Sequence, residues 1–433
     1  MSNVARVTVG ATAMSSHLLA WWLAVGLVGS SATAWRLPGL PLGFGELVML
    51  GWLIVEWGRR FNDGKFRLHG THWRSSPLDA VALLVTLGAL AAAQIWAILV
   101  GQFAWYAQRD FVAIILAGGL ALTLSSMRDR EEFSQLLVMA FFWIAVGFSS
   151  LLLLHTAIGV FFGGPLLTFS STFGTRFLGL ATNPNQFALF SLTLPICLGL
   201  AWMRYKGATR CLGVVLGLLA LLAGLATQSD ALALVWMILA ISALGVYLYP
   251  LYNKSAIQRP ALVVAFSISL AFLGWSQIPQ FVTNRTGTGG WTTTLAKAIE
   301  EERLVNPYQQ NQVGNRLALY ENGIRAWLDS PWVGHGVQMV SGLTGPYQGN
   351  ESHNTLIDWL TFAGVLGMLP LLAWSVLLVS GAWRRRNLLG LGALLAGAAF
   401  AQFGLYARHP LFWVLACAFA FLPGQLPGSR GSR

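Results

Sequence analysis

The run LDAVALLVTLGALAAAQIWAILV, residues 78–100, is almost wholly apolar and decides the class of fold. A helix rises about 1.5 Å per residue, so about 20 apolar residues cross a hydrocarbon core of about 30 Å. Residues 134–156 and 355–382 form similar runs, and others recur along the whole chain. This repetition predicts an all-α integral membrane protein.

The composition supports the same class. Hydrophobic residues make up 55% of the 433 residues, and charged residues make up only 10%. Soluble globular domains carry about a quarter of charged residues, so an ordinary soluble enzyme is excluded. We expect about twelve transmembrane helices, at residues 17–35, 39–57, 78–100, 109–126, 134–156, 184–203, 212–228, 230–250, 261–279, 355–382, 388–407 and 410–422.

The formal net charge of +11 raises the question of a nucleic-acid partner, and the position of the basic residues answers it. Twelve spans place both termini on one side of the membrane. If that side is the cytoplasm, most of the 27 Lys and Arg residues fall in cytoplasmic connectors, as the positive-inside rule describes. We therefore expect cytoplasmic termini and no nucleic-acid partner.

Two outer connectors are much longer than the others, and they divide the chain. Residues 1–279 hold spans 1–9 and include the first long connector, 157–183. Residues 280–354 form the second connector, which predicts a small helical subdomain outside the membrane. Residues 355–433 hold spans 10–12 and a cytoplasmic tail.

Connector 157–183 contains no acidic residue and one cation, Arg176, which suits a stretch at the membrane interface. Asn183 and Asn185 flank Pro184 at the start of the sixth span. Asn at the N-cap and Pro at the first helical position are typical of a helix start. The free N–H groups at such an end attract anions.

The connector 280–354 predicts two short helices, at about 292–304 and from about 314, and the second carries two arginines. Arg325 has Glu321 four residues before it and Asp329 four after it, so pairing within the helix is open to it. Arg316 has no acidic residue at these offsets. An unpaired guanidinium near a bilayer typically holds an anion, and Arg316 is therefore a candidate ligand.

A histidine stands directly before the tenth span, in Ser352-His353-Asn354. Ser352 or Asn354 can cap that helix. The positive end of the helix dipole favours the neutral form of His353, which can then accept a proton at neutral pH. The alternative is an interfacial histidine that only caps. For His335, between two glycines, a turn residue and a ligand are both open.

These outer groups predict an anionic guest, and a diphosphate in particular, because Arg presents a planar fork of hydrogen-bond donors. The sequence has no Walker glycine loop, no Cys pair with zinc spacing and no Asp-x-Asp pair in an outer segment. His69 and His72 lie in a cytoplasmic connector and are a weak metal signal. We therefore expect neither a metal nor another cofactor.

The order of the outer motifs resembles that of the bacterial O-antigen ligase and polymerase superfamily. The motifs are Arg176-Phe177-Leu178-Gly179-Leu180, Asn183-Pro184-Asn185, Gly314-Asn315-Arg316, Pro331-Trp332-Val333-Gly334-His335-Gly336, and His353-Asn354 with Gly364 eleven residues after the histidine. They cover about 120 residues of the chain, whereas the other spans match the family in number and hydropathy only. The resemblance implies a GT-C-like architecture of about twelve transmembrane helices with a periplasmic helical subdomain between spans 9 and 10.

The resemblance also implies a function in lipopolysaccharide biosynthesis. The enzyme would transfer a glycan from undecaprenyl diphosphate to lipid A-core oligosaccharide, at the periplasmic face of the bacterial inner membrane, without a metal and with inversion. Membrane lipids would be its other partners. The implied roles are general base for His353, diphosphate binding for Arg176, Arg316 and Arg325, and support for Asn183, Asn185 and Asn354.

Three other functions stay open. An O-antigen polymerase would use a second carrier-linked glycan as acceptor, and a protein O-oligosaccharyltransferase would use a Ser or Thr side chain. A flippase or transporter for lipid-linked oligosaccharide belongs to another class, and it predicts two pseudo-symmetric halves with broken spans near mid-depth. No internal repeat is visible in the sequence, which disfavours the transporter.

Overall fold

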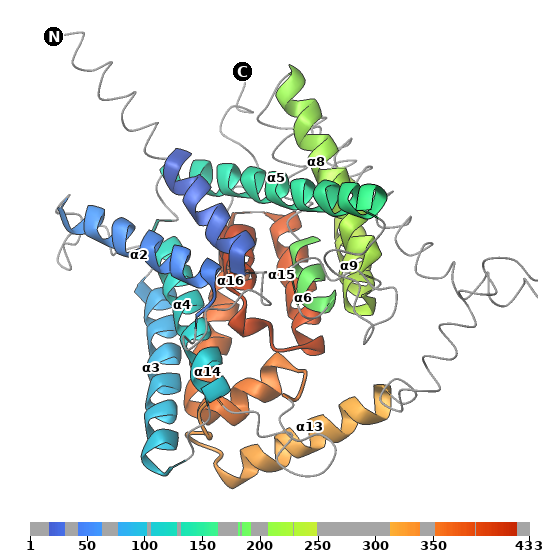
Figure 1. The fold of residues 1–433 in the computed structure, drawn as a ribbon. Helices are drawn as coiled ribbons and strands as arrows, with labels where there is room; N and C mark the ends of the chain where they lie inside the picture. Colours follow the sequence, from blue (N-terminus) through green and yellow to red (C-terminus); the bar gives the residue numbers. More distant parts are fainter. Residues whose placement is uncertain are drawn as a thin grey trace, which may run out of the picture.

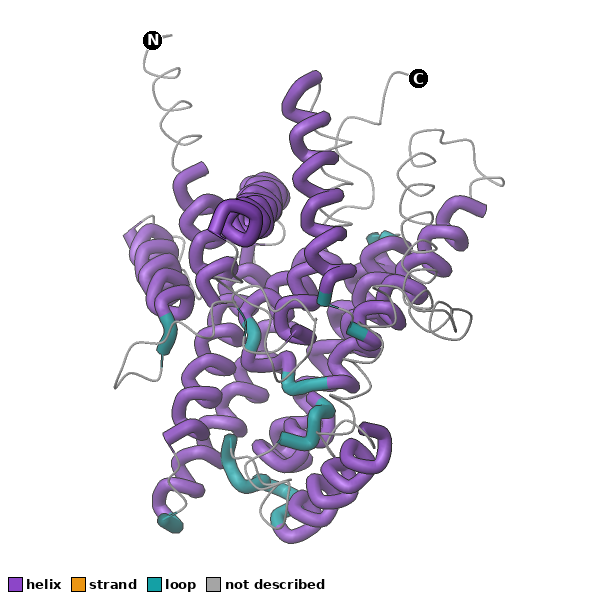
Figure 2. Tube along the Cα trace, turned by 45° about the vertical axis from the view of Figure 1, so that its right-hand side comes forward, coloured by secondary structure: helices purple, strands orange, loops and turns teal. Residues whose placement is uncertain are grey.

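The computed structural model describes residues 17–30, 42–62, 77–101, 105–127, 131–162, 181, 184–191, 207–227, 229–248, 312–337, 351–385 and 387–421. The regular elements in these ranges are all helical, as the tube in Figure 2 shows. After the helix His17–Ser30 they are α2 (Phe44–Asn62), α3 (Pro77–Leu99), α4 (Trp105–Met127), α5 (Glu131–Phe162), α6 (Pro184–Ser191), α8 (Gly207–Ala226), α9 (Asp230–Leu248), α13 (Gln312–Asp329), α14 (Thr355–Arg384), α15 (Leu388–Phe400), the 3₁₀ helices η5 (Ala401–Phe403) and η6 (Tyr406–Arg408), and α16 (Pro410–Phe421).

Three of these helices are long and apolar enough to cross a membrane: Leu78–Leu99, Ala107–Met127 and Thr355–Arg384. Shorter apolar helices are His17–Ser30, Phe133–Gly147, Gly390–Phe400 and Pro410–Phe421. The described helices are therefore consistent with the predicted helical membrane protein. The number of twelve spans and the outer subdomain stay predictions, because residues 249–311 lie outside the described part of the chain.

Most helix starts lie within three residues of the predicted ones, but α2, α4 and α8 begin four or five residues away from theirs, and the ends of α5 and α15 also differ. Helix α2 begins at Phe44, five residues after the predicted start. Helix α15 ends at Phe400, where a span to residue 407 was expected, and two 3₁₀ turns follow it. The connector between α15 and α16 is therefore not a continuous apolar helix, and it contains Arg408.

The helices pack in pairs (Figure 1). Helix α14 lies along α3, α15 along α9, and α16 along α4. Helix α5 instead runs across one end of this bundle in Figure 1. Three tryptophans join α14 to α16, with ring centroids 6.2 Å apart for Trp359–Trp413 and 5.3 Å for Trp374–Trp413. The Trp413 indole N–H also donates to the Ala407 carbonyl over 2.6 Å, which fixes the turn before α16.

Helix α14 is broken at Gly364, a feature that the hydropathy of the sequence does not reveal. Gly364 has φ 59° and ψ −162°, a conformation in which only glycine is unstrained. The break interrupts the helical hydrogen-bond ladder inside an apolar span. Groups in such a place must find partners within the protein, because lipid offers none.

The loop that follows α13 supplies these partners. The N–H groups of His335 and Gly336 donate to the carbonyls of Thr361 and Phe362 over 2.8 and 3.0 Å. In return, the N–H groups of Val365 and Leu366 donate to the carbonyls of Pro331 and Trp332 over 2.9 and 3.1 Å. The loop 331–336 therefore takes the place of the missing helical turn.

Candidate active site

The predicted base, His353, lies in a short segment that is fixed at the start of α14. Asn354 is the N-cap, as one of the two predicted capping residues, and its side-chain oxygen accepts from the N–H groups of Leu356 and Ile357 over 3.0 and 3.2 Å. Ser352 is tied to Asp358, whose Oδ1 accepts from the Ser352 N–H and hydroxyl over 2.8 and 2.6 Å. Both neighbours of His353 are therefore held by α14.

His353 itself has an unusual backbone. Its φ is +56°, and it is the one residue other than glycine with a positive φ among the residues that the structure describes. Such a conformation costs a residue with a side chain about 1–3 kcal/mol and persists where the surroundings impose it. The side chain is 40% exposed, whereas Ser352 and Asn354 are buried. The strained turn therefore presents one imidazole from an otherwise buried segment.

The imidazole lies beside a buried carboxylate. Nδ1 of His353 is 3.3 Å from Oε1 of Glu351. Burial by itself would raise the pKa of Glu351, but the attraction of the Arg408 guanidinium and the contact with His353 outweigh it. The net result lowers the pKa of Glu351 to about 2. Glu351 is therefore an anion throughout the physiological range.

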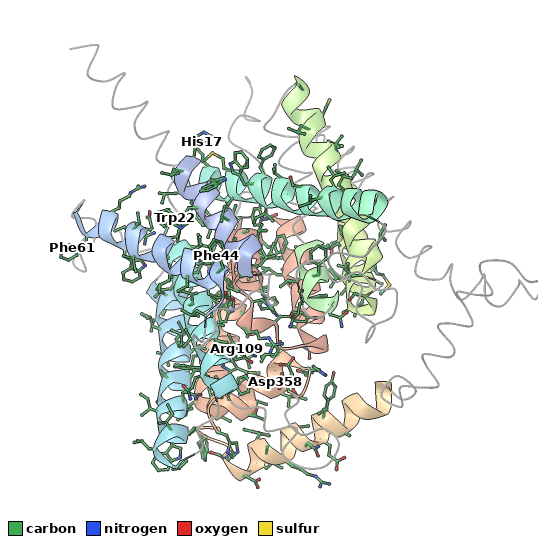
Figure 3. The ribbon with its side chains drawn as sticks, in the orientation of Figure 1. His17, Trp22, Phe44, Phe61, Arg109 and Asp358 are labelled. Carbon is green, nitrogen blue, oxygen red and sulfur yellow. The ribbon has the colours of Figure 1, made fainter. Side chains whose placement is uncertain are left out.

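Arg408 joins this carboxylate to a second one. Its Nη1 is 3.0 Å from Oε2 of Glu351 and 3.2 Å from Oδ2 of Asp110, near the start of α4. Burial would lower the pKa of Arg408, but the two carboxylates outweigh it and raise that pKa above its ordinary value. Arg109 completes the row, with Nη2 2.8 Å from Oδ1 of Asp110. Figure 3 labels Arg109 from α4 and Asp358 from α14 at this place.

The segment that carries Arg408 is itself bound to the start of α14. The Thr355 hydroxyl donates to the Gly404 carbonyl over 2.6 Å and accepts from the Tyr406 N–H over 3.2 Å. The Asn354 amide donates to Oε1 of Gln402 over 2.9 Å. Charged side chains from α4, the 351–354 segment and η6 therefore form one fixed unit, defined here as the ion cluster Arg109, Asp110, Glu351 and Arg408.

Helix α13 is attached to the same place. The Tyr320 hydroxyl donates to the Gln402 carbonyl over 2.9 Å. Arg316 lies four residues before Tyr320, so the helical register puts both positions on one face of α13. The Arg316 side chain lies outside the described residues, and its role in binding diphosphate stays a prediction.

The described part of the chain does not place the other predicted ligands beside His353. Arg176 and Asn183 lie outside them, and Asn185 is in α6, which packs against α8, α9 and α16. Arg325 is exposed and forms an ion pair with Glu321, which is the pairing within the helix that the sequence favours. Its contact with a diphosphate stays a prediction too.

His335 stabilises the loop 331–336. Its Nε2 lies 2.7 Å from the Ala326 carbonyl, and its backbone N–H supports the break in α14. The interpretation as a turn residue is therefore supported by both ends of the residue. Among the residues that the structure describes, no group of three or more His, Cys, Asp or Glu side chains is placed to hold a metal ion.

Sequence reasoning missed Glu351, Arg408 and the Asp110–Arg109 pair. One signal was present, because Asp110 lies inside a predicted span, and an ionisable residue in a span is by default a candidate for function. The pairing itself joins Arg408 to residues that lie 298 and 57 positions before it, and no local pattern reveals it. These residues add a buried ion cluster to a site that the sequence predicted only through a base and anion ligands.

Residues 212–372 match a family model described as O-Antigen ligase. This match supports the assignment of residues 212–372 to the O-antigen ligase and polymerase superfamily. The matched region covers somewhat more than a third of the chain and contains His353 and Gly364, whereas the O-antigen ligase model does not reach Asp110 or Arg408. The family implies a glycosyltransferase-like membrane enzyme that uses lipid-linked glycan and lipid acceptor substrates in general. Searches of curated proteins and of solved structures each returned no match.

Proposed function

We propose that this protein is an O-antigen ligase. It transfers a glycan from undecaprenyl diphosphate to lipid A-core oligosaccharide, at the periplasmic face of the bacterial inner membrane, with both termini in the cytoplasm. The proposal rests on the family match together with one observation, the exposed imidazole of His353 on an otherwise buried and tightly bonded segment. A site that presents one proton acceptor at the end of apolar helices suits two amphiphilic substrates that meet at the membrane surface.

The proposed reaction is a single displacement. The acceptor hydroxyl attacks the anomeric carbon of the donor, and its proton passes to Nε2 of His353. The bond between the anomeric carbon and the diphosphate oxygen breaks, so the products are the glycosylated lipid and undecaprenyl diphosphate. Attack opposite to the leaving group inverts the anomeric centre. The diphosphate leaving group supplies the driving force, and ATP is not needed.

Arginine residues stabilise the leaving group in this proposal. Charge develops on the diphosphate as the glycosidic bond breaks, and guanidinium groups placed there lower the energy of the transition state. We assign this role to Arg176 and Arg316, with Arg325 as a further candidate. Support for Arg316 comes from its register on α13 with Tyr320, because Tyr320 contacts the Gln402 segment that also holds Asn354.

The broken helix is compatible with this enzyme and gives little support to transport. A transporter uses the free backbone groups of broken helices to bind its cargo. At the Gly364 break the carbonyls of Thr361 and Phe362 and the N–H groups of Val365 and Leu366 are all paired with the loop 331–336. The break therefore shapes the protein and offers no site to a passing substrate.

The experiment that tests the proposal identifies the product. Purified protein in nanodiscs receives undecaprenyl diphosphate-linked glycan and lipid A-core oligosaccharide, with and without EDTA, and the products are separated by mass. Glycan on lipid A-core in both samples is the expected result. Lengthened carrier-linked glycan would instead establish a polymerase, loss of product with EDTA would contradict the metal-independent mechanism, and no covalent product from active substrates would favour transport.

A further inference from the structure

Glu351 lies between the proposed base and a buried cation. Its Oε1 is 3.3 Å from Nδ1 of His353 and 3.4 Å from Nη2 of Arg408, and its Oε2 is 3.0 Å from Nη1 of Arg408. Oε1 therefore lies beside both the imidazole and the guanidinium, and Oε2 forms an ion pair with the guanidinium. Arg408 is in turn held by Asp110, so the carboxylate has a defined position and cannot turn freely.

We propose that Glu351 is the positioning residue of His353, and that Arg408 and Asp110 hold it in place. This inference rests on the proposed function, in which His353 is the general base. A carboxylate that accepts a hydrogen bond from Nδ1–H fixes the ring and its tautomer. The lone pair then lies on Nε2, which is the atom that must take the proton from the acceptor hydroxyl.

The ion cluster also suits the charge that develops during the reaction. Its two arginines and two carboxylates cancel, so the cluster is neutral before the reaction. When His353 takes a proton, the new imidazolium lies next to the carboxylate of Glu351, and opposite charges at this distance attract. Arg408 does not oppose the new charge strongly, because Asp110 and Glu351 both neutralise it.

The substitution Glu351→Gln separates positioning from simple packing. The amide has one oxygen and one NH₂ group in place of two oxygens. Arg408 has donors only, so the amide oxygen turns to Arg408 and the NH₂ group faces His353. Nδ1 must then act as acceptor, and the proton moves to Nε2. The variant keeps the shape of the side chain and selects the tautomer that cannot act as a base.

The test compares kcat and KM for the wild type, Glu351→Gln, Glu351→Ala and Glu56→Gln in the transfer assay. Glu56→Gln is the matched control, because Glu56 is also buried and has an arginine, Arg60, at 2.9 Å, but it lies on α2 away from the site. We expect Glu351→Gln to lower kcat about 10- to 100-fold with little change in the donor KM, because a lost positioning group weakens general base catalysis and leaves binding intact. The control should stay within about twofold of the wild type.

The order of the two Glu351 variants is the decisive readout. Alanine leaves the tautomer of His353 free, so Glu351→Gln should be at least as slow as Glu351→Ala, although it should be the more stable of the two. If packing were the only role, the isosteric glutamine would be the more active variant, and that order would overturn the inference. If Glu351→Ala does not fold, the kcat of Glu351→Gln against Glu56→Gln decides, and equal values would also overturn it.

His353→Ala in the same series distinguishes this inference from the proposed function. An inactive His353→Ala together with a fully active Glu351→Gln would refute the positioning role and leave the function in place. A fully active His353→Ala would refute the assignment of His353 as the general base, and the positioning role of Glu351 would be refuted with it.

Discussion

Replacement of Gly364 by alanine tests the structural account of the broken helix most severely. A Cβ added at this position would lie 2.3 Å from the carbonyl carbon and oxygen of Trp332 and 2.6 Å from the Val333 nitrogen. These are backbone atoms, so no rotamer change can relieve the overlap. The φ of 59° with ψ of −162° is also unfavourable for alanine.

The expected cost follows from two contributions. Backbone strain at such a position costs about 1–3 kcal/mol. To admit the methyl group, the loop must move away, and the bonds from Val365 to Pro331 and from Leu366 to Trp332 are the nearest to break. Each of the two N–H groups left without a partner in the helix costs about 1–3 kcal/mol, so strain and these two groups together cost about 3–9 kcal/mol.

Thermal unfolding of the purified protein in detergent measures this cost, and Gly88→Ala is the control. Gly88 lies in α3, where an added Cβ would meet no atom within 4 Å, and alanine is the better helix former there. We expect Gly364→Ala to lower Tm strongly and Gly88→Ala to leave it unchanged or raise it. Equal Tm values for the two variants would refute the interpretation of the break.

Three further predictions follow from the site. Asn354→Ala removes the cap of α14 and should cost about 0.5–2 kcal/mol of stability, measured by chemical denaturation, whereas Asn354→Asp should keep most of it. The pKa of Glu351 is lowered from 4.5 to about 2 on folding, so its contribution to stability is present above pH 4.5 and is lost as the pH falls towards 2. The fall in Tm on acidification should therefore be smaller in Glu351→Gln than in the wild type. An equal fall in the two proteins would contradict this prediction. Arg316→Gln should raise the donor KM more than Arg325→Gln, since Glu321 already neutralises Arg325; the reverse order in transfer kinetics would assign the diphosphate to Arg325.

The sequence predicts the described helices well because their signals are local. Pro184 and Pro410 begin their helices, and Asn354 caps α14, where a start signal and an apolar run coincide. The break at Gly364 could not be predicted, because glycine within an apolar run is also common in unbroken helices. The loop 331–336, which completes the hydrogen bonds, lies about 30 residues before the break and contacts it only in the folded chain.

The residues of the site also differ in how far the local sequence predicts them. His353 could be predicted because the local sequence places it directly before a helix start. Glu351 lies two residues away, but its place in the site depends on the ion pair with Arg408. Folding brings Arg408 there from the connector between α15 and α16. Ion pairs between distant segments depend on how helices pack, and hydropathy patterns do not contain that information. Arg176 and Asn183 lie outside the described residues, so their roles rest on the motifs alone.

The most direct measurement of the central claim is glycan transfer by His353→Ala beside the wild type. Both proteins, in nanodiscs, receive saturating undecaprenyl diphosphate-linked glycan and lipid A-core oligosaccharide, and donor binding is measured separately. His17→Ala is the control, because His17 is exposed at the start of the first helix. The account predicts that His353→Ala binds the donor normally and loses transfer by about 10²–10⁴-fold. Transfer by His353→Ala at the rate of the wild type and the control would contradict it.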